Sequence, residues 1–248
     1  MNPLLLNSSD DYFDSPIIVA LDYDNEPDVM NLITKLNPHL CKLKVGKELF
    51  TATGPKLIEK LVASGFKVFL DLKFHDIPNT VQKACTTASN LGIWMLNVHA
   101  SGGAKMLESA KFGVENAQHK PLLIAVTVLT SMKQNDLTQT GINTNLSTHV
   151  INLAKLSYSA GLDGVVCSAQ EAKLIKNVTS QDFLTITPGI RLVAPNLSNT
   201  TITNDDQNRI MTPALAIANL ANYIVIGRPI TLATDPYIAL VNILSSIQ

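Results

Sequence analysis

The chain has 248 residues, of which 46% are hydrophobic and 16% are charged. This length fits one large α/β domain or two small ones, and the composition supplies a sizeable core, which excludes a disordered chain. The formal net charge is −1, so no overall positive field attracts nucleic acid, and any phosphate binding must come from a local pocket.

The first fifteen residues do not resemble a targeting segment. They hold a run of three leucines with no basic residue before it, unlike a secretory signal, and no apolar stretch approaches the length that spans a bilayer. We expect residues 1–15 to form a loosely held tail and residues 16–248 to form one domain. The cysteines, at positions 41, 85 and 167, lie in apolar contexts without metal-ligand spacing, which indicates reduced core residues in a cytoplasmic protein.

Strands and helices alternate along the chain. Apolar, β-branched runs predict eight strands, at residues 17–21, 41–45, 67–72, 94–98, 122–128, 164–167, 183–186 and 223–226. Helical spacing predicts helices at about 27–36, 55–64, 81–91, 104–116, 147–160, from 170, and at 236–247. This alternation predicts an α/β fold of the (β/α)8 TIM barrel type.

The competing architecture is an open, doubly wound sheet. That fold wants a glycine-rich turn after its first strand, and the chain has Asp22-Tyr23-Asp24 there, so the barrel is favoured. Two long polar segments, 131–145 and 192–208, interrupt the alternation and are typical of lids or insertions.

The segment Val68–Val81, VFLDLKFHDIPNTV, places Asp71, Lys73 and Asp76 at and just beyond the end of an apolar strand. Alternate side chains of a strand share a face roughly 7 Å apart, so Asp71 and Lys73 point the same way. Asp76 lies past the strand end and is free to point elsewhere. A buried carboxylate–ammonium pair is rarely retained for stability alone, which favours a catalytic role over a solvated ion pair.

Residues that follow the strands of a barrel converge on one mouth. The polar candidates at these positions are Asp22, Lys44, Asp71, Lys73, His99, Thr130, Arg191 and Arg228. The pairs Lys44–Asp71 and Lys73–Asp76 predict an alternating network that holds a lysine charged and in place, as electrostatic catalysis requires. For His75 and His99 we expect a structural or supporting role, since this chemistry needs neither a base nor a metal ligand.

Two loops near the end of the chain predict a phosphate site. Pro188-Gly189-Ile190-Arg191 follows the seventh strand, and Ile226-Gly227-Arg228-Pro229 follows the eighth. Barrels often bind phosphate with these two loops. Gly227 permits close backbone approach, and Arg228 supplies a bidentate fork for phosphate oxygens.

At these residues the chain resembles the orotidine 5′-phosphate decarboxylase family. The resemblance covers nearly the whole chain, in the blocks IIVALD, LKVGKELF, FLDLKFHDIPNTV, NVHASGG, VTVLTSM, GLDGVVCSAQE, TPGIR and IGRP. It implies a cytoplasmic homodimeric barrel that converts orotidine 5′-phosphate (OMP) to UMP and CO₂ in pyrimidine biosynthesis. It also implies shared active sites, no cofactor, no metal, and no nucleic-acid or membrane partner.

The resemblance also assigns roles by motif. Lys44, Asp71 and Lys73 form the charged array, to which the partner subunit contributes Asp76. By the same resemblance, Asp22 contacts the ribose, as does Thr80 from across the dimer interface. Thr130 lies beside the pyrimidine, and the phosphate is bound by Arg191, Gly227 and Arg228. The loop after Arg191 is several residues longer than in close bacterial relatives, and Gln207 is the best match for a family glutamine that links pyrimidine and phosphate.

The implied reaction needs electrostatic stabilisation. Loss of CO₂ from pyrimidine C6 leaves electron density in an sp² orbital that the ring cannot accept, and the Lys73 ammonium can stabilise the carbanion and then protonate it. Two alternatives stay open. One is a lyase or aldolase that uses the Asp71–Asp76 motif with Mg²⁺ to stabilise an enediolate, and the other is a non-catalytic sensor of a phosphoribosyl ligand.

Overall fold

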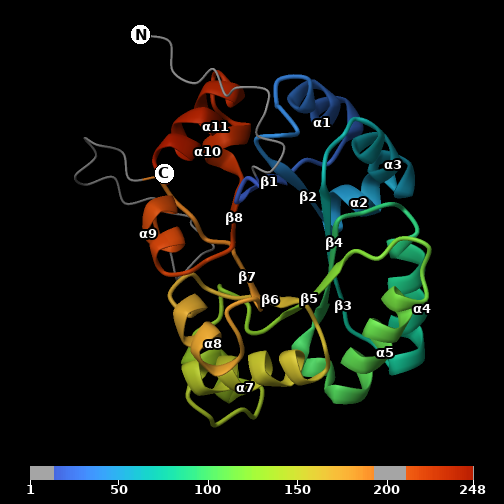
Figure 1. The fold of residues 1–248 in the computed structure, drawn as a ribbon, viewed down its shortest axis with the longest axis vertical. Coiled ribbons are helices and arrows are strands. Elements are labelled where there is room, and N and C mark those ends of the chain that lie inside the picture. Colours follow the sequence, from blue (N-terminus) through green and yellow to red (C-terminus); the bar gives the residue numbers. More distant parts are fainter. Residues whose placement is uncertain (1–13, 193–210, 248) are drawn as a thin grey trace.

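The computed structural model describes residues 14–192 and 211–247. Its parallel strands close into a barrel in chain order, with the last strand beside the first (Figure 1). The strands are β1 Ile17–Leu21, β2 Lys42–Gly46, β3 Val68–Phe74, β4 Met95–His99, β5 Leu122–Val126, β6 Gly164–Val166, β7 Leu184–Thr187 and β8 Tyr223–Ile226. The predicted (β/α)8 barrel is confirmed, and the open sheet is wrong.

Helices surround the barrel on its outer side (Figure 1). They are α1 Glu26–Ile33, α2 Lys47–Thr53, α3 Pro55–Ala63, α4 Pro78–Ser89, α5 Ala104–Glu115, α6 Gln134–Gln139, α7 Leu146–Ser159, α8 Ala172–Val178, α9 Pro213–Ala218, α10 Arg228–Thr231 and α11 Pro236–Ser245, with a 3₁₀ turn, η1, at Ala100–Gly102. Several begin with proline, whose missing N–H costs nothing at a first turn. None of the helices in the described ranges is long and apolar enough to cross a bilayer.

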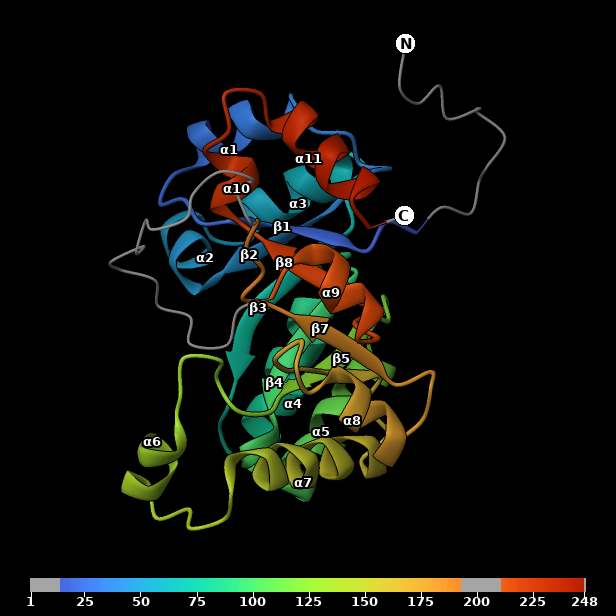
Figure 2. The same ribbon diagram turned by 90° about the vertical axis from the view of Figure 1, so that its left-hand side faces the viewer.

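The polar segment 131–145 contains a helix that the sequence pattern did not predict. Helix α6 projects from the body of the barrel (Figure 2). Its one buried residue, Leu137, is too little for a periodic signal. The Gln134 side chain ties the helix to the next one by accepting a hydrogen bond from the backbone N–H of Leu146, at 2.7 Å. The second polar segment, 192–208, lies outside the described residues except for Leu192.

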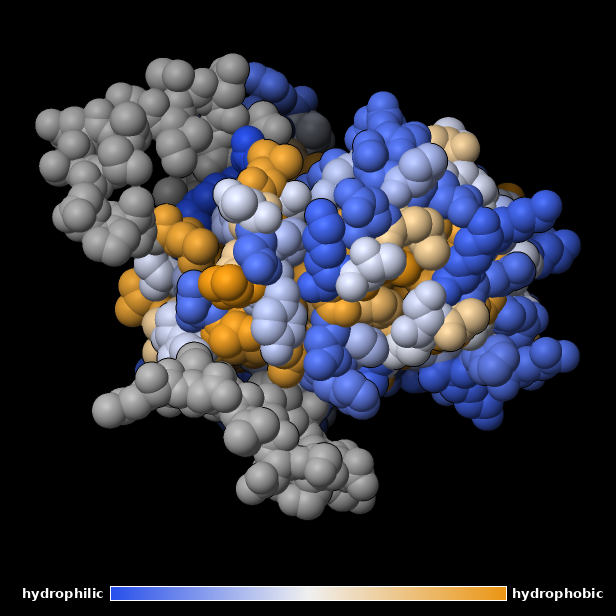
Figure 3. Space-filling model, turned by 90° about the horizontal axis from the view of Figure 1, so that it is seen from above, coloured by the Kyte–Doolittle hydropathy of each residue, from blue (hydrophilic) through white to orange (hydrophobic). Residues whose placement is uncertain are grey.

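Alternate residues of the strands face inward and outward. The outward ones pack against the helices in one large apolar cluster. The inward ones fill the barrel with a second, smaller cluster made of Ile18, Ala20, Phe69, Met95, Ile124, Ile186 and Val225. The face drawn in Figure 3 is mainly hydrophilic on its right-hand side, whereas apolar residues gather toward the left.

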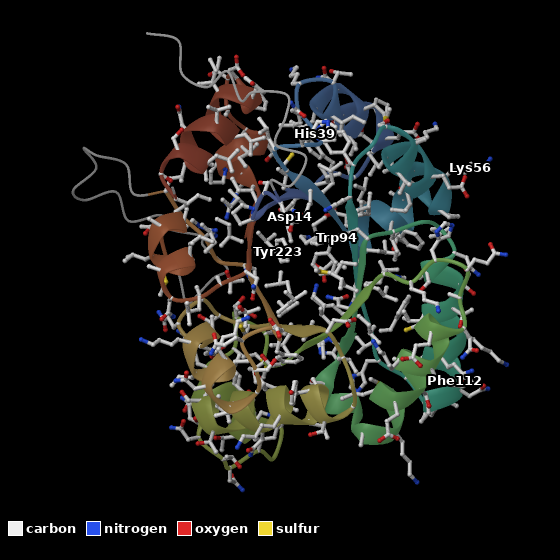
Figure 4. All side chains as sticks on the ribbon, viewed as in Figure 1. Asp14, His39, Lys56, Trp94, Phe112 and Tyr223 are labelled. Atoms are coloured by element: carbon white, nitrogen blue, oxygen red, sulfur yellow. The ribbon has the colours of Figure 1, made fainter. Side chains whose placement is uncertain are left out.

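Polar side chains close the amino end of the barrel. We call this group the basal cluster: Asp14, Ser15, Lys42, Lys67, Trp94 and Tyr223. The Lys42 ammonium is buried, lies 2.9 Å from the Asp14 carboxylate, and stands over the rings of Trp94 and Tyr223 at 5.2 and 4.8 Å. Figure 4 labels Asp14, Trp94 and Tyr223, which lie close together. Asp14, which the sequence pattern places in the tail, is thus held in place, and so is Ser15, whose Oγ donates a hydrogen bond to the Leu40 carbonyl at 2.6 Å. Burial raises the pKa of Asp14, but hydrogen bonds from Tyr223, Lys42 and Lys67 outweigh it and lower that pKa to about 2.

Candidate active site

A cavity of about 350 Å³ opens at the carboxyl ends of the strands. Eight of the residues predicted from the sequence line it: Asp22, Lys44, Asp71, Lys73, Thr130, Arg191, Gly227 and Arg228. They come from segments spread over the whole chain. The closed barrel brings them together because Lys44, Asp71 and Lys73 face inward from β2 and β3, and the others follow the carboxyl ends of parallel strands.

Asp71 lies between two lysines on the floor of this cavity. Its Oδ1 is 2.7 Å from the Lys73 Nζ, and its Oδ2 is 3.4 Å from the Lys44 Nζ. The Lys44 Nζ also lies 3.8 Å from the Asp22 carboxylate. Only 11% of the Asp71 side chain is exposed, so the charges interact more strongly than they would in bulk water. The result is a row of alternating charges at the mouth of the barrel.

A side chain that the sequence analysis missed supports this row. Asn97 on β4 is completely buried; its Oδ1 accepts a hydrogen bond from the Lys73 backbone N–H at 2.8 Å, and its Nδ2 donates to Asp71 Oδ1 at 2.6 Å. A signal existed in the sequence: Asn97 lies between Met95 and His99 at inward-facing positions, where a polar residue in a core strand is unusual.

Asp76 and Thr80 do not line the cavity. Both are exposed near the start of α4, and Asp76 Oδ1 accepts a hydrogen bond from the Ile77 backbone N–H at 2.6 Å. Within the described ranges of this single chain, the ion pair formed by Lys73 is with Asp71, and none joins it to Asp76. Gln207, the remaining predicted residue, lies outside the described residues.

Two histidines stand beside the array. The ring centroids of His75 and His99 are 5.4 Å apart. Burial, together with the neighbouring His75, Lys47 and Lys73, lowers the pKa of His99 to about 4, against a smaller opposing effect of the Asp71 carboxylate. His99 is therefore neutral near pH 7 and adds no charge to the array. In the part of the chain that is described, no three His, Cys, Asp or Glu side chains group as metal ligands would.

The remaining walls of the cavity differ in character from the floor. Val126 at the end of β5, Val128 just beyond it and Val166 at the end of β6 form an apolar wall. Arg191 and Arg228 follow β7 and β8. Gly227 allows close packing here, since a Cβ at this position would lie 3.0 Å from Asp22 Oδ2. The site thus combines a charged floor, an apolar side and a cationic rim, and it suits a flat ring attached to an anionic group.

The barrel, the position of the cavity and the row of alternating charges together define a (β/α)8-barrel enzyme with an electrostatic site. The chain belongs to the orotidine 5'-phosphate decarboxylase / HUMPS family, whose family model matches residues 15–242. The family resemblance inferred from the sequence blocks is confirmed, and with it the assignment of the chain as an enzyme.

Individual relatives match over nearly their full lengths. An orotidine 5'-phosphate decarboxylase of Neisseria meningitidis serogroup A is 54% identical over 237 residues, covering 95% of this chain and 94% of the relative. One from Chromobacterium violaceum is 51% identical over 240 residues, covering 97% and 94%. The crystal structure of orotidine 5'-phosphate decarboxylase from Lactobacillus acidophilus superposes with a TM-score of 0.81 at 41% identity, covering 95% of this chain and 100% of that one.

Proposed function

We propose that the enzyme decarboxylates OMP to UMP and CO₂ in pyrimidine biosynthesis, without a metal or cofactor. The observation that carries the proposal is the Lys73 ammonium, held 2.7 Å from the Asp71 carboxylate inside a cavity whose rim carries Arg191 and Arg228. The charged pair suits the reacting carbon, and the two arginines suit the phosphate.

The chemistry follows from these positions. When the bond between C6 and the carboxylate carbon breaks, its electron pair stays on C6 and CO₂ leaves. The Lys73 ammonium stabilises that charge and then transfers a proton to C6, which gives UMP and a neutral amine that regains its proton from water. Asp71 fixes Lys73 beside the carbon and opposes the substrate carboxylate, so the repulsion is relieved as CO₂ departs.

The phosphate end assists from a distance. The guanidinium groups of Arg191 and Arg228 bind the phosphate, with the backbone of Gly227 close by. Binding energy from this remote group favours the closed, aligned site in which the charged array acts on C6. Asp22, whose carboxylate lies 3.8 Å from the Lys44 Nζ, contacts the ribose.

We further propose a cytoplasmic homodimer in which two chains complete each site. Asp76 and Thr80 are exposed outside the cavity of their own chain, on either side of the start of α4, and Ile77 beside them is 67% exposed. From this position, Asp76 and Thr80 are free to reach the cavity of a second copy across an isologous two-fold interface. The partner's Asp76 then joins the array, and the partner's Thr80 contacts the ribose.

The decisive assay follows the loss of OMP absorbance with purified protein, before and after exhaustive EDTA treatment. We expect turnover to survive chelation. Activity that is abolished by EDTA and restored by Mg²⁺ would instead favour an enediolate-forming lyase. Tight UMP binding without turnover would favour a sensor.

A further inference from the structure

We propose that Asn97 is a positioning residue that sets the geometry of both members of the Lys73–Asp71 pair. The inference rests on the proposed function, because it assigns Asn97 a role in the same charged array. Asn97 lies beneath the array, does not line the cavity, and acts through its neighbours.

The first argument is the backbone at Lys73. Lys73 has a φ of +54°, in the left-handed region that a lysine rarely adopts. The pairing of β3 with β4 also breaks here: Leu70 pairs with Leu96, but the next paired residue on β3 is Phe74, opposite Val98. Three residues of β3 therefore face one residue of β4, and that residue is Asn97.

The Asn97 side chain supplies a hydrogen bond where the regular pairing of the two strands is interrupted. Its Oδ1 accepts the Lys73 backbone N–H at 2.8 Å, in an interior where an unpaired N–H is costly. The hydrogen bond holds Lys73 in the left-handed conformation, which turns its side chain across the mouth toward Asp71. Asn97 thereby fixes the direction in which the ammonium leaves the strand.

The second argument is the orientation of the Asp71 carboxylate. Asp71 Oδ1 accepts from both the Lys73 Nζ, at 2.7 Å, and the Asn97 Nδ2, at 2.6 Å, while Oδ2 faces the Lys44 Nζ at 3.4 Å. With the amide in place, each carboxylate oxygen is directed at one lysine. Because the amide is neutral, it fixes this rotation without adding charge to the array.

The orientation of the amide is itself determined by its partners. The Lys73 N–H can only donate and the ionised Asp71 carboxylate can only accept, so the Asn97 oxygen and nitrogen cannot exchange places. Asparagine is the shortest side chain that supplies, without charge at neutral pH, an acceptor and a donor on two separate atoms. An aspartate at this position would direct a second carboxylate at Asp71, and a leucine would satisfy neither neighbour.

This role predicts a specific kinetic signature. Asn97→Ala should lower kcat by about 10- to 100-fold, as expected when a reacting group loses its alignment. The Kd for UMP should change little, because the phosphate-binding loops after β7 and β8 are untouched. Asn222→Ala is the matched control, since Asn222 Oδ1 accepts the Thr185 backbone N–H at 3.0 Å at the opposite end of the barrel. The control should lower the thermal midpoint and leave kcat unchanged.

A second variant keeps the volume of the side chain and tests the charge argument. In Asn97→Asp the introduced carboxyl can still donate to Asp71 when protonated, but it repels Asp71 when ionised. We expect kcat of N97D to fall as the pH rises through an inflection that the wild type lacks. If N97A does not fold, this pH profile decides the question alone.

The proposal is overturned if folded N97A has wild-type kcat, if its decrease in kcat matches that of N222A at equal loss of stability, or if N97D shows no added inflection. Lys73→Ala separates this failure from failure of the proposed function. If Lys73→Ala is inactive and N97A is fully active, the role of Asn97 is contradicted and the proposed function stands. An active Lys73→Ala removes both.

Discussion

Replacing Lys73 by alanine removes the ammonium that lies 2.7 Å from Asp71. At about 4 Å from a developing carbanion, and with an effective dielectric constant near 20, one positive charge contributes about 4 kcal/mol, or roughly a thousandfold in rate. Loss of the proton donor removes a further factor of about 10²–10⁴. We therefore expect kcat to fall by about 10⁵- to 10⁷-fold.

The variant should remain folded. Asp71 keeps its hydrogen bond from Asn97, at 2.6 Å, and its ion pair with Lys44, at 3.4 Å, so no buried carboxylate is left unpaired. Absorbance decay of OMP measures kcat, calorimetry with UMP measures binding, and the thermal midpoint reports folding. Lys111→Ala is the control, because the Lys111 Nζ forms an ion pair with Asp163 at 3.5 Å and neither residue lines the cavity. Wild-type kcat in Lys73→Ala would refute the assignment of Lys73 as charge and proton donor.

Three further changes test other parts of the structure. Arg228→Ala should lower kcat/KM for OMP by an amount that corresponds to about 1.5–3 kcal/mol of lost binding energy. Turnover of orotidine, which lacks the phosphate, should be affected much less. Equal losses on both substrates would mean that Arg228 acts structurally. The Lys73→Ala and Asp76→Ala homodimers should each be nearly inactive. When the two are mixed and exchange subunits, about half the dimers become heterodimers with one intact site, so activity should recover to roughly a quarter of wild type. No recovery after proven exchange would place Asp76 in its own chain's site. Asp14→Asn should reduce the free energy of unfolding at pH 7 by about 1–3 kcal/mol, discounted for the half-exposed carboxylate. Because the pKa of Asp14 is lowered to about 2, this stabilisation is present above pH 3.8 and is lost as the pH falls through 2. Urea unfolding of both proteins should therefore converge in strong acid, and a gap independent of pH would contradict the ionic account.

Much of the fold was predictable because the barrel strands are short apolar runs separated by helical spacing. The predictions differ from the structure at the ends of elements: β3 extends to Phe74 and β5 ends at Val126. The short helices α9 and α10, of six and four residues, were also missed. A helix of this length is too short for apolar periodicity to be recognised, and its position is set by the neighbouring strands.

The site was predictable to the extent that chemistry follows strand ends. Asp71 and Lys73 are two residues apart on one strand, which predicted that their side chains share a face, and the structure brings them together. The alternation of side chains along a strand does not predict the left-handed conformation of Lys73, since no glycine or turn residue marks it in the sequence. Asn97 was missed because it lies below the mouth, among the apolar residues of β4 and before the strand end at His99. The position of Asp76 relative to Lys73 depends on a second chain, which one sequence does not place in space.

The basal cluster has a consequence for the pairing of β2. This strand carries lysines at 42 and 44, both facing inward, one toward each end of the barrel. A slip of two residues keeps every side chain on its own face, so apolar patterning alone would tolerate an arrangement with the wrong lysine at the mouth. The contacts of Lys42 with Asp14, Trp94 and Tyr223 exist in one of these registers. The contacts at the amino end of the barrel thus determine that Lys44, and not Lys42, lies at the carboxyl end, where the cavity opens.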